Sequence, residues 1–384
     1  EMSASLVGSE MCIRDRITFA RDYQLRTMYR RVIKPVLFSL TIEQAHHAVL
    51  LLLRIIGLIP GGRWLLRKCY AVEHPALERE VFGIRFPNPV GLAAGFDKDA
   101  EVYEEMASLG FGFVEVGTIT PLAQPGNPKP RLFRLPMDHA LINRMGFNNQ
   151  GVASAVHRLH RRNRFYHRRH PVVLGGNLGK NTLTPNEKAP ADYLRLFRSL
   201  YEYVNYFVIN VSCPNVANLS CLQNKEHLKK LLEGLIDFRR GQNHYRPILL
   251  KISPDLSDEQ IDEMIEVLVE NGLDGIVATN TTTSRQGLLT PSDLVAEIGN
   301  GGLSGGPLTE RSLEMVRYIH KKTEGRFPII GVGGIMTEDD AVAMLDAGAS
   351  LIEVYTGFIY NGPGFAKRIC KRLKEEAILS LIHI

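Results

Sequence analysis

The chain has 384 residues, of which 45% are hydrophobic and 23% are charged, with 34 glycines and 20 prolines. This composition is typical of a globular protein and excludes a largely disordered or low-complexity chain. The net charge of +5 is too small to make nucleic acid the expected partner, and five cysteines without a C-x-x-C pair favour a reduced, intracellular setting.

The two ends of the chain differ from its body. Residues 1–27 lack both the apolar core of a signal peptide and a regular periodicity, and Met28 opens a more regular pattern. We therefore expect residues 1–27 to be a non-native or disordered flank. Residues 378–384 add an apolar stretch after a charged helix, and we expect them to be a non-native tail.

Residues 28–75 predict a small amphipathic segment made of two short helices. Thr41 and Gln44 have the spacing of a capping box, and apolar residues recur at helical spacing from there towards Pro60. The apolar run is shorter than the roughly 20 residues that cross a bilayer. Arginines and lysines flank it, so two interpretations stay open: helices that lie in a membrane interface, or helices packed wholly on the core.

Residues 76–377 contain short apolar runs that alternate with amphipathic helical patterns. Such alternation predicts a parallel sheet covered by helices, and eight units without a break favour a closed (β/α)8 TIM barrel of the α/β class. A doubly wound sheet is the alternative. The eight predicted strands cover residues 89–96, 111–120, 172–179, 206–215, 247–253, 274–282, 328–335 and 350–358.

The carboxyl ends of these runs carry residues that a barrel core would not contain, and in such barrels the active site lies at this end. Four amides, Asn177, Asn210, Asn215 and Asn280, occupy such positions. A single one is typical of a turn, but four can converge on a planar polar ligand.

Two lysines also occupy these strand ends. Lys98 follows the first strand, and Lys251 lies within the fifth, where an unpaired ammonium group would cost several kcal/mol. Lys251 therefore either pairs with a carboxylate of a neighbouring strand or faces a ligand that becomes negative during a reaction.

Glycine-rich segments follow the last two strands, at residues 331–335 and 355–357, and residues 302–305 add a third. Barrels of this type bind phosphate at this place through backbone N–H groups. The segment 331–335 fits the dinucleotide motif G-x-G-x-x-G poorly. A cofactor with one phosphate, such as flavin mononucleotide (FMN), is therefore expected.

Cys213, after the fourth strand, is the candidate general base, because a thiol there can take a proton from a carbon acid if its pKa lies near neutrality. Ser212 is the rival for that role. No pattern suggests a metal site, a Ser/His/Asp triad or a P-loop. The basic run 157–170 is interpreted as a solvated helix end rather than a site for RNA or lipid headgroups.

Several motifs together closely resemble the dihydroorotate dehydrogenases, specifically the membrane-associated, quinone-dependent class 2. They are GLAAGFDKD, VGTITPLAQPGNPKPRLFRL, LINRMGFNNQG, NVSCPN, ATNTT, GGLSGGPL, GVGGI and YTGF, and the resemblance extends from about Met28 to Arg372. It implies FMN contacts from Ala94, Gly95, Phe96, Asp97, Lys98, Thr118, Asn177, Asn210, Lys251, Thr279, Gly305, Gly334, Tyr355 and Thr356. It implies dihydroorotate contacts from Lys98, Asn143, Arg144, Met145, Gly146, Phe147, Asn210, Asn215, Asn280 and Thr281.

The resemblance also implies the reaction. The base takes a proton from C5 of (S)-dihydroorotate, hydride passes from C6 to flavin N5, and a membrane quinone reoxidises the flavin, in the biosynthesis of UMP. We expect a monomer held peripherally on the cytoplasmic face of a bacterial inner membrane by the N-terminal helices.

One residue departs from the class 2 pattern, in which serine is the usual base. Cys213 is the choice of the soluble class 1 enzymes, which reduce fumarate or NAD. The N-terminal helical segment, which class 1 lacks, favours quinone. Two different kinds of protein also fit parts of the sequence. A tRNA dihydrouridine synthase would have a C-terminal helical domain that is not evident here, and a catalytically silent membrane-docking barrel would leave the amides and lysines unexplained.

Overall fold

The computed structural model describes residue 24 and residues 26–163, 172–215, 219 and 225–382. Its centre is a closed barrel of eight parallel strands, each paired with the next one of the barrel along the chain. The predicted TIM barrel is therefore confirmed, and closure excludes the doubly wound sheet. The strands are β3 (Val90–Asp97), β4 (Phe113–Ile119), β7 (Val173–Leu178), β8 (Tyr206–Asn210), β9 (Ile248–Ile252), β10 (Gly275–Ala278), β12 (Ile329–Val332) and β13 (Leu351–Val354).

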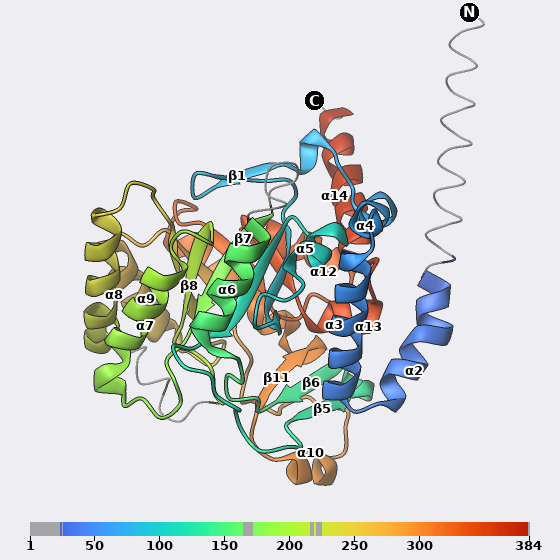
Figure 1. Cartoon of the computed structure of the whole chain (residues 1–384), viewed down its shortest axis with the longest axis horizontal. Helices are drawn as coiled ribbons and strands as arrows, with labels where there is room; N and C mark the ends of the chain where they lie inside the picture. Colours follow the sequence, from blue (N-terminus) through green and yellow to red (C-terminus); the bar gives the residue numbers. More distant parts are fainter. Residues whose placement is uncertain (1–23, 25, 164–171, 216–218, 220–224, 383–384) are drawn as a thin grey trace, which may run out of the picture.

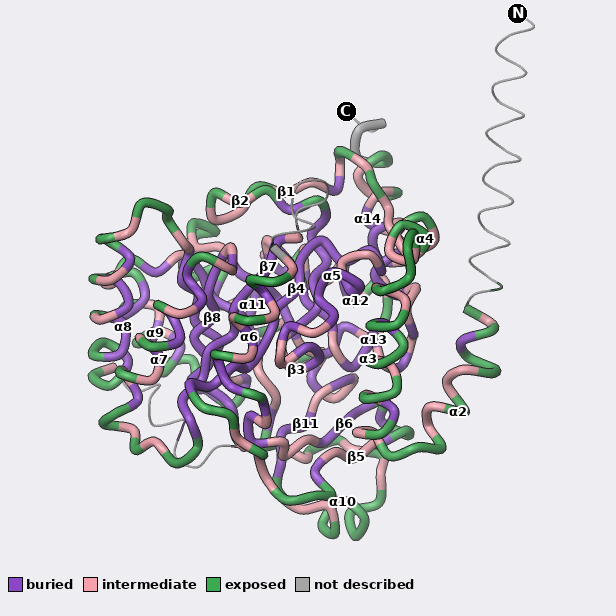
Figure 2. The backbone as a smooth tube through the Cα atoms, in the orientation of Figure 1, coloured by how far each residue is buried: buried purple, intermediate pink, exposed green. Residues whose placement is uncertain are grey.

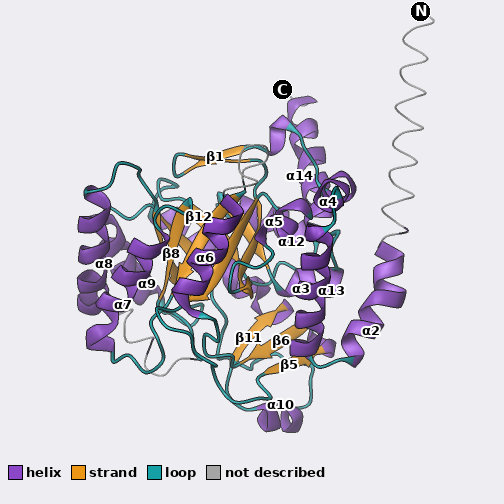
Figure 3. Ribbon diagram, in the orientation of Figure 1, coloured by secondary structure: helices purple, strands orange, loops and turns teal. Residues whose placement is uncertain are grey.

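Helices surround the barrel, as Figures 1 and 3 show, and apolar residues of these helices share one core cluster with the strands. Figure 2 shows buried residues concentrated in the strands and on the inner sides of these helices. The helices around the barrel are α5 (Tyr103–Ser108), α6 (Gly151–Asn163), α7 (Ala189–Leu200), α8 (Lys225–Arg240), α9 (Asp258–Glu270), α11 (Thr309–Lys322), α12 (Glu338–Asp346), α13 (Thr356–Asn361) and α14 (Phe365–Ile382). Helix α10 (Ser292–Ile298) buries none of its residues and lies beside the small sheet that contains β11. Short 3-10 turns cover Pro75–Leu77, Pro136–Asp138, Asn186–Lys188 and Gly306–Leu308.

Two small sheets close the barrel at its ends, and sequence patterns did not predict them. The hairpin of β1 (Arg79–Val81) and β2 (Ile84–Phe86) places Phe86 against Phe113 at the amino end, with ring centroids 5.2 Å apart. At the carboxyl end, β5 (Leu132–Leu135), β6 (Ala140–Asn143) and β11 (Gly302–Gly305) form an antiparallel sheet. The amino end is therefore filled by aromatic rings, whereas the second sheet lies over the candidate site.

The N-terminal segment contains more helices than the two predicted. A π-helical turn (Tyr29–Ile33) leads into α2 (Lys34–Ser39), and α3 (Ile42–Leu58) and α4 (Gly62–Tyr70) follow. The capping box of Thr41 and Gln44 is present at the start of α3. The two-helix prediction was wrong because Gly61, with a φ of 82°, turns the chain and lets a separate helix restart directly after Pro60.

The interpretation that this segment packs wholly on the core was wrong. Helix α3 buries Ala45 and Leu53 against the barrel, but many of its other apolar side chains are exposed, and α4 buries none of its residues. No single described helix is long and apolar enough to cross a membrane; α3 and α4 reach such a length and composition only as a pair bent by 113°.

Buried ion pairs attach α4 to the barrel. Arg63 lies 2.8 Å from Glu104 and 2.6 Å from Glu105, and Arg162 lies 3.1 Å from each of the same two carboxylates. Arg162 belongs to the basic run, of which residues 164–170 lie outside the described part. The described residues of the run, 157–163, belong to helix α6. The expectation of a solvated face was wrong for Arg162, because the acidic residues of α5 pair with it.

The chain continues as a helix through residue 378, where we expected the tail to begin. Helix α14 begins at Phe365 and continues to Ile382 without interruption. Most of the predicted N-terminal flank lies outside the described residues.

Candidate active site

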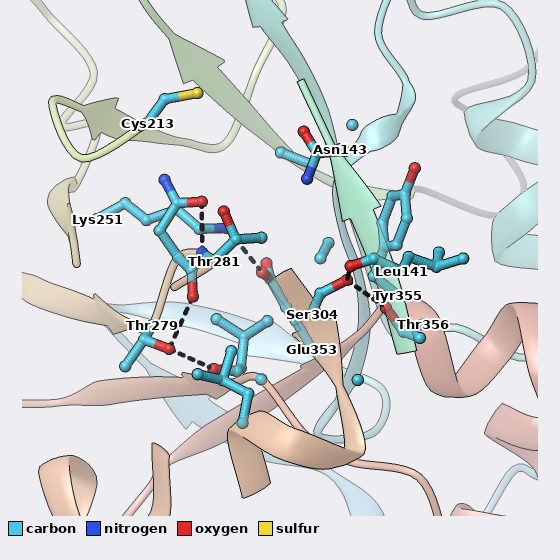
Figure 4. A pocket seen from close by; sticks show the side chains of 18 of the residues that line it. Leu141, Asn143, Cys213, Lys251, Thr279, Thr281, Ser304, Glu353, Tyr355 and Thr356 are labelled. Carbon is cyan, nitrogen blue, oxygen red and sulfur yellow. Dashed lines mark hydrogen bonds and ion pairs between the residues drawn. The ribbon is translucent and has the colours of Figure 1, made fainter. Parts of the chain in front are cut away.

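A cavity opens at the carboxyl ends of the barrel strands, under the sheet formed by β5, β6 and β11 (Figure 4). It contains about 1130 Å³ of atom-free space, part of which is open to solvent. Charged, amide and glycine residues line it beside apolar ones, so the cavity offers polar contacts to a bound ligand.

Hydrogen-bonded amides connect the carboxyl ends of β4, β7, β8 and β10 on one side of this cavity. The Asn210 amide donates to Thr118 Oγ1 at 3.1 Å, and the Asn280 amide donates to Asn210 Oδ1 at 3.2 Å. Thr118 in turn donates to Asn177 at 2.6 Å. This network fixes the amide orientations, so that Asn210 and Asn280 present defined donors and acceptors to a ligand.

Lys98 and Lys251 both line the cavity. The Lys98 ammonium donates to Asn148 Oδ1 at 2.6 Å, and burial, reinforced by the charge of Arg131, lowers its pKa to about 8. Such a lysine is still mostly charged at neutral pH and is placed to meet an anionic group.

Lys251 combines the two roles left open by its sequence position. Its Nζ lies 3.9 Å from Glu353 Oε2, and its side chain is only 7% exposed. The carboxylate does not come from a neighbouring strand, because β9 pairs with β8 and β10, whereas Glu353 lies on β13. Both residues line the cavity, so Lys251 has a distant ion pair and also faces the ligand space.

Cys213 lines the cavity and Ser212 does not. The Ser212 hydroxyl accepts a hydrogen bond from the Asn280 amide at 2.9 Å, which gives it a place in the amide network. Burial raises the pKa of the Cys213 thiol to about 11, although hydrogen bonds to Asn215 and the charges of Lys98 and Lys251 oppose this rise. Geometry therefore favours Cys213 over Ser212, while the thiol is protonated at neutral pH in the absence of a ligand.

A cradle of glycines forms another part of the wall. Gly333 and Gly334 have φ values of 116° and 74°, and a Cβ on Gly334 would lie 2.2 Å from Thr309 Cα. Successive N–H groups in such a turn form a concavity that binds anions. Gly305 lies at the same wall, and the hydroxyls of Ser304 and Thr356 are 2.8 Å apart there.

Most of the expected site residues meet at this one cavity. Cys213 lines it together with the expected cofactor and substrate residues Ala94, Gly95, Lys98, Thr118, Asn143, Met145, Gly146, Phe147, Asn210, Asn215, Lys251, Thr279, Asn280, Thr281, Gly305, Gly334, Tyr355 and Thr356. The Asn215 amide donates to Asn143 Oδ1 at 2.8 Å, which joins the loop after β8 to strand β6.

Four expected residues do not line the cavity. Phe96 packs edge-on against His46 and Phe358, and the Asp97 carboxylate accepts hydrogen bonds from the backbone N–H groups of Glu101 and Val102. Asn177 lies below the cavity and donates to Glu115 at 3.2 Å. The Arg144 guanidinium donates to the carbonyl groups of Pro130 and Ile298.

Sequence reasoning missed two buried glutamates and a half-buried histidine close to the site. Glu115 and Glu353 lie inside the barrel, and His46 of α3 makes a 2.7 Å hydrogen bond with the Phe96 carbonyl. Burial lowers the pKa of His46 to about 4, so the ring is neutral and Nε2 donates. An acidic residue within an otherwise apolar strand was the signal that could have revealed the two glutamates.

No group of three or more potential metal ligands occurs in the part of the chain that the structure describes. The site instead combines two lysines, hydrogen-bonded amides, a thiol and an anion-binding turn. Such a set can bind a planar, anionic ring beside a phosphorylated cofactor and can move one proton.

Comparison with known proteins gives a consistent result. A family model described as dihydroorotate dehydrogenase matches residues 76–377, about four-fifths of the chain. The chain belongs to the dihydroorotate dehydrogenase family. A curated relative from Christiangramia forsetii, named dihydroorotate dehydrogenase (quinone), is 52% identical over 351 residues, which cover 91% of this chain and 100% of the relative. A relative of the same name from Synechococcus sp. (strain JA-3-3Ab) is 48% identical, covering 90% and 92%.

Solved structures agree with this membership of the dihydroorotate dehydrogenase family. The crystal structure of the DHODH of Eimeria tenella in complex with ferulenol has a TM-score of 0.80 and 37% identity, and covers 90% of this chain and 95% of that chain. Its ligand-free form has a TM-score of 0.76 and 40% identity, with coverages of 83% and 93%. The expected family and enzyme class are thereby confirmed, and the dihydrouridine synthase and the catalytically silent barrel are set aside.

Proposed function

We propose that this protein oxidises (S)-dihydroorotate to orotate with FMN and passes the electrons to a membrane quinone, as a step in the biosynthesis of UMP. The observation that carries the proposal is the convergence of Lys98, Lys251, Cys213 and the amides on one cavity, in a chain about half identical to proteins named dihydroorotate dehydrogenase (quinone).

The residues of the cavity fit FMN. The turn at Gly333 and Gly334 offers backbone N–H groups to a single phosphate, and a side chain at Gly334 would collide with Thr309. The amides of the strand ends suit the polar edge of a flavin ring. When bound, FMN supplies the hydride acceptor and later releases electrons to quinone.

The chain itself orients the substrate and moves the proton. Lys98 meets the dihydroorotate carboxylate, while Asn280 and the hydrogen-bonded pair of Asn143 and Asn215 bind the ring amides. The Cys213 thiolate takes the proton from C5 as hydride leaves C6. Because burial raises the pKa of the Cys213 thiol to about 11, the base depends on a minor ionised fraction at neutral pH.

The N-terminal segment supports a peripheral position on a membrane that carries quinone. Helices α3 and α4 expose Leu58 (84%), Trp64 (63%) and Leu51 (57%), and Arg67 and Lys68 lie in the last turn of α4. An exposed apolar surface with adjacent cations fits the interface of an anionic bilayer. We propose a monomer on the cytoplasmic face of a bacterial inner membrane.

Rapid mixing under anaerobic conditions tests the function. Dihydroorotate should bleach the yellow protein, and a quinone should restore the flavin absorbance far faster than fumarate or NAD. Recovery on fumarate or NAD would instead indicate a class 1 acceptor, as Cys213 suggests. If dihydroorotate leaves the flavin oxidised, the substrate assignment fails.

A further inference from the structure

The interior of the barrel is apolar towards its amino end and contains charged residues towards its carboxyl end. Towards the amino end, Tyr206, Leu249 and Leu351 belong to an apolar cluster that contains Phe86 and Phe113. Towards the carboxyl end, the same strands or their neighbours carry charged residues. Glu115 and Glu353 are both 0% exposed and lie between the apolar layer and the ligand cavity, of which Glu353 forms a wall.

These two carboxyl groups have more acceptor oxygens than hydrogen-bond donors around them. Glu115 accepts one hydrogen bond, from the Asn177 amide at 3.2 Å, and its Oε1 has no donor among the described residues. Neither oxygen of Glu353 has a donor there. The hydroxyl of Tyr206, another titratable group facing this layer, makes no hydrogen bond of normal geometry there, and burial together with the nearby Glu115 carboxyl raises the pKa of Tyr206 well above its usual range.

The charges do not balance either. Lys251 is the cation that pairs with this layer, and its Nζ approaches Glu353 Oε2 only to 3.9 Å. Two ionised carboxylates would therefore leave an uncompensated negative charge among buried groups, which is unfavourable. Burial and the adjacent Glu115 carboxyl raise the pKa of Glu353 well above its usual range, and the charge of Lys251 only partly opposes them.

A proton on Glu353 corrects both imbalances. It turns one orphaned oxygen into a donor toward Glu115, and it leaves one carboxylate opposite one ammonium group. Two adjacent carboxyl groups that cannot both ionise share a proton in this way.

We propose that Glu353 is a neutral carboxylic acid that shares its proton with Glu115 and so leaves the positive charge of Lys251 directed into the cavity. The effect of this proton on the cofactor rests on the proposed function. An ionised Glu353 would screen Lys251, whereas a neutral Glu353 lets Lys251 stabilise negative charge that develops on a bound flavin. Glu353 is thus a positioning residue that keeps the Lys251 charge available to the cofactor.

Two isosteric variants test the inference in the purified, flavin-loaded protein. Infrared spectra should contain the carbonyl stretch of a protonated carboxyl group. Glu353→Gln should remove this band and change the ratio of reduced to oxidised flavin at a fixed potential by less than about threefold, because glutamine replaces a neutral group by a neutral group. A rise of about tenfold or more, which is about 1.4 kcal/mol, would mean that Glu353 is ionised and would overturn the inference.

Glu115→Gln separates proton sharing from burial alone. Without the neighbouring carboxylate, Lys251 should favour the ionised form of Glu353, so the band should disappear although Glu353 is still present. A band that persists in Glu115→Gln contradicts the shared proton. The band is independent of substrate, so a protein that contains it, loses it in both variants and yet is not reduced by dihydroorotate would support this inference and refute the proposed function.

Discussion

The barrel and the N-terminal segment use amphipathic helices in opposite ways. Helix α11 of the barrel buries Met315, Val316 and Ile319 completely, whereas α3 leaves Leu51 and Ile55 about half exposed on the outside of the molecule. In Figure 1 the segment lies along one side of the barrel rather than over it. The barrel therefore buries the apolar side chains of its helices, whereas the segment leaves many of its own exposed. Variants in the two regions should affect different half-reactions.

The largest effect is expected from removing the thiol of the barrel site. Cys213→Ala should retain bound flavin but slow its reduction by dihydroorotate about 10³-fold at neutral pH, because the variant lacks the proposed acceptor of the C5 proton. Stopped-flow absorbance measures this step directly. Cys69→Ala, which changes a half-buried thiol outside the cavity, is the control and should react normally. Unchanged reduction in Cys213→Ala would refute the base assignment.

The next prediction weakens the connection between the two regions. Arg63→Met removes the ion pair between Arg63 and Glu105 and leaves the pair with Arg162. The side chain of Glu105 is only 1% exposed, so the lost pair is a buried one. Breaking a buried ion pair costs about 3–5 kcal/mol. Hydrogen exchange should show lost protection in α4 before any loss in the barrel strands. Arg67→Met removes the more exposed pair with Glu73 and should cost less than about 1 kcal/mol.

If both arginine variants lower protection equally, the buried cluster does not anchor the segment. If protection falls across the barrel strands as well, the two regions unfold as one cooperative unit and the comparison between them fails.

The barrel was largely predictable from the sequence, and the reasons are physical. The strands are mainly apolar and polar residues follow at their carboxyl ends, so both the eight-strand count and the amide positions could be inferred locally. The direction in which a side chain points could not be inferred in this way. Phe96 and Asp97 adjoin Gly95 in sequence, but their side chains leave the cavity. The pairing of Lys251 with Glu353 depends on barrel closure, which brings together strands that are not neighbours.

A pH dependence should follow from Lys98. Burial and the charge of Arg131 lower the pKa of Lys98 to about 8, so the free protein loses this cation as the pH rises through that value. The KM for dihydroorotate should then increase about tenfold per pH unit above pH 8, while vesicle binding is unaffected. Lys98→Arg, which stays charged, should give a flat KM over the same range, although at a higher value. A KM in the original protein that is flat from about pH 7 to 10 would exclude Lys98 as the carboxylate partner.

The smallest effect is expected on the outer face of the N-terminal segment. Leu58 is 84% exposed at the end of α3, and burying a leucine side chain in an apolar medium contributes about 1.5–3 kcal/mol. Leu58→Glu should therefore weaken binding to anionic vesicles by about tenfold or more and raise the KM for a membrane-embedded quinone, with an unchanged rate of flavin reduction by dihydroorotate. Leu183, which is 94% exposed in the loop after β7, supplies the matched control. Equal losses of vesicle binding in Leu58→Glu and Leu183→Glu would show that general charge, rather than the apolar face of α3, determines attachment to the membrane.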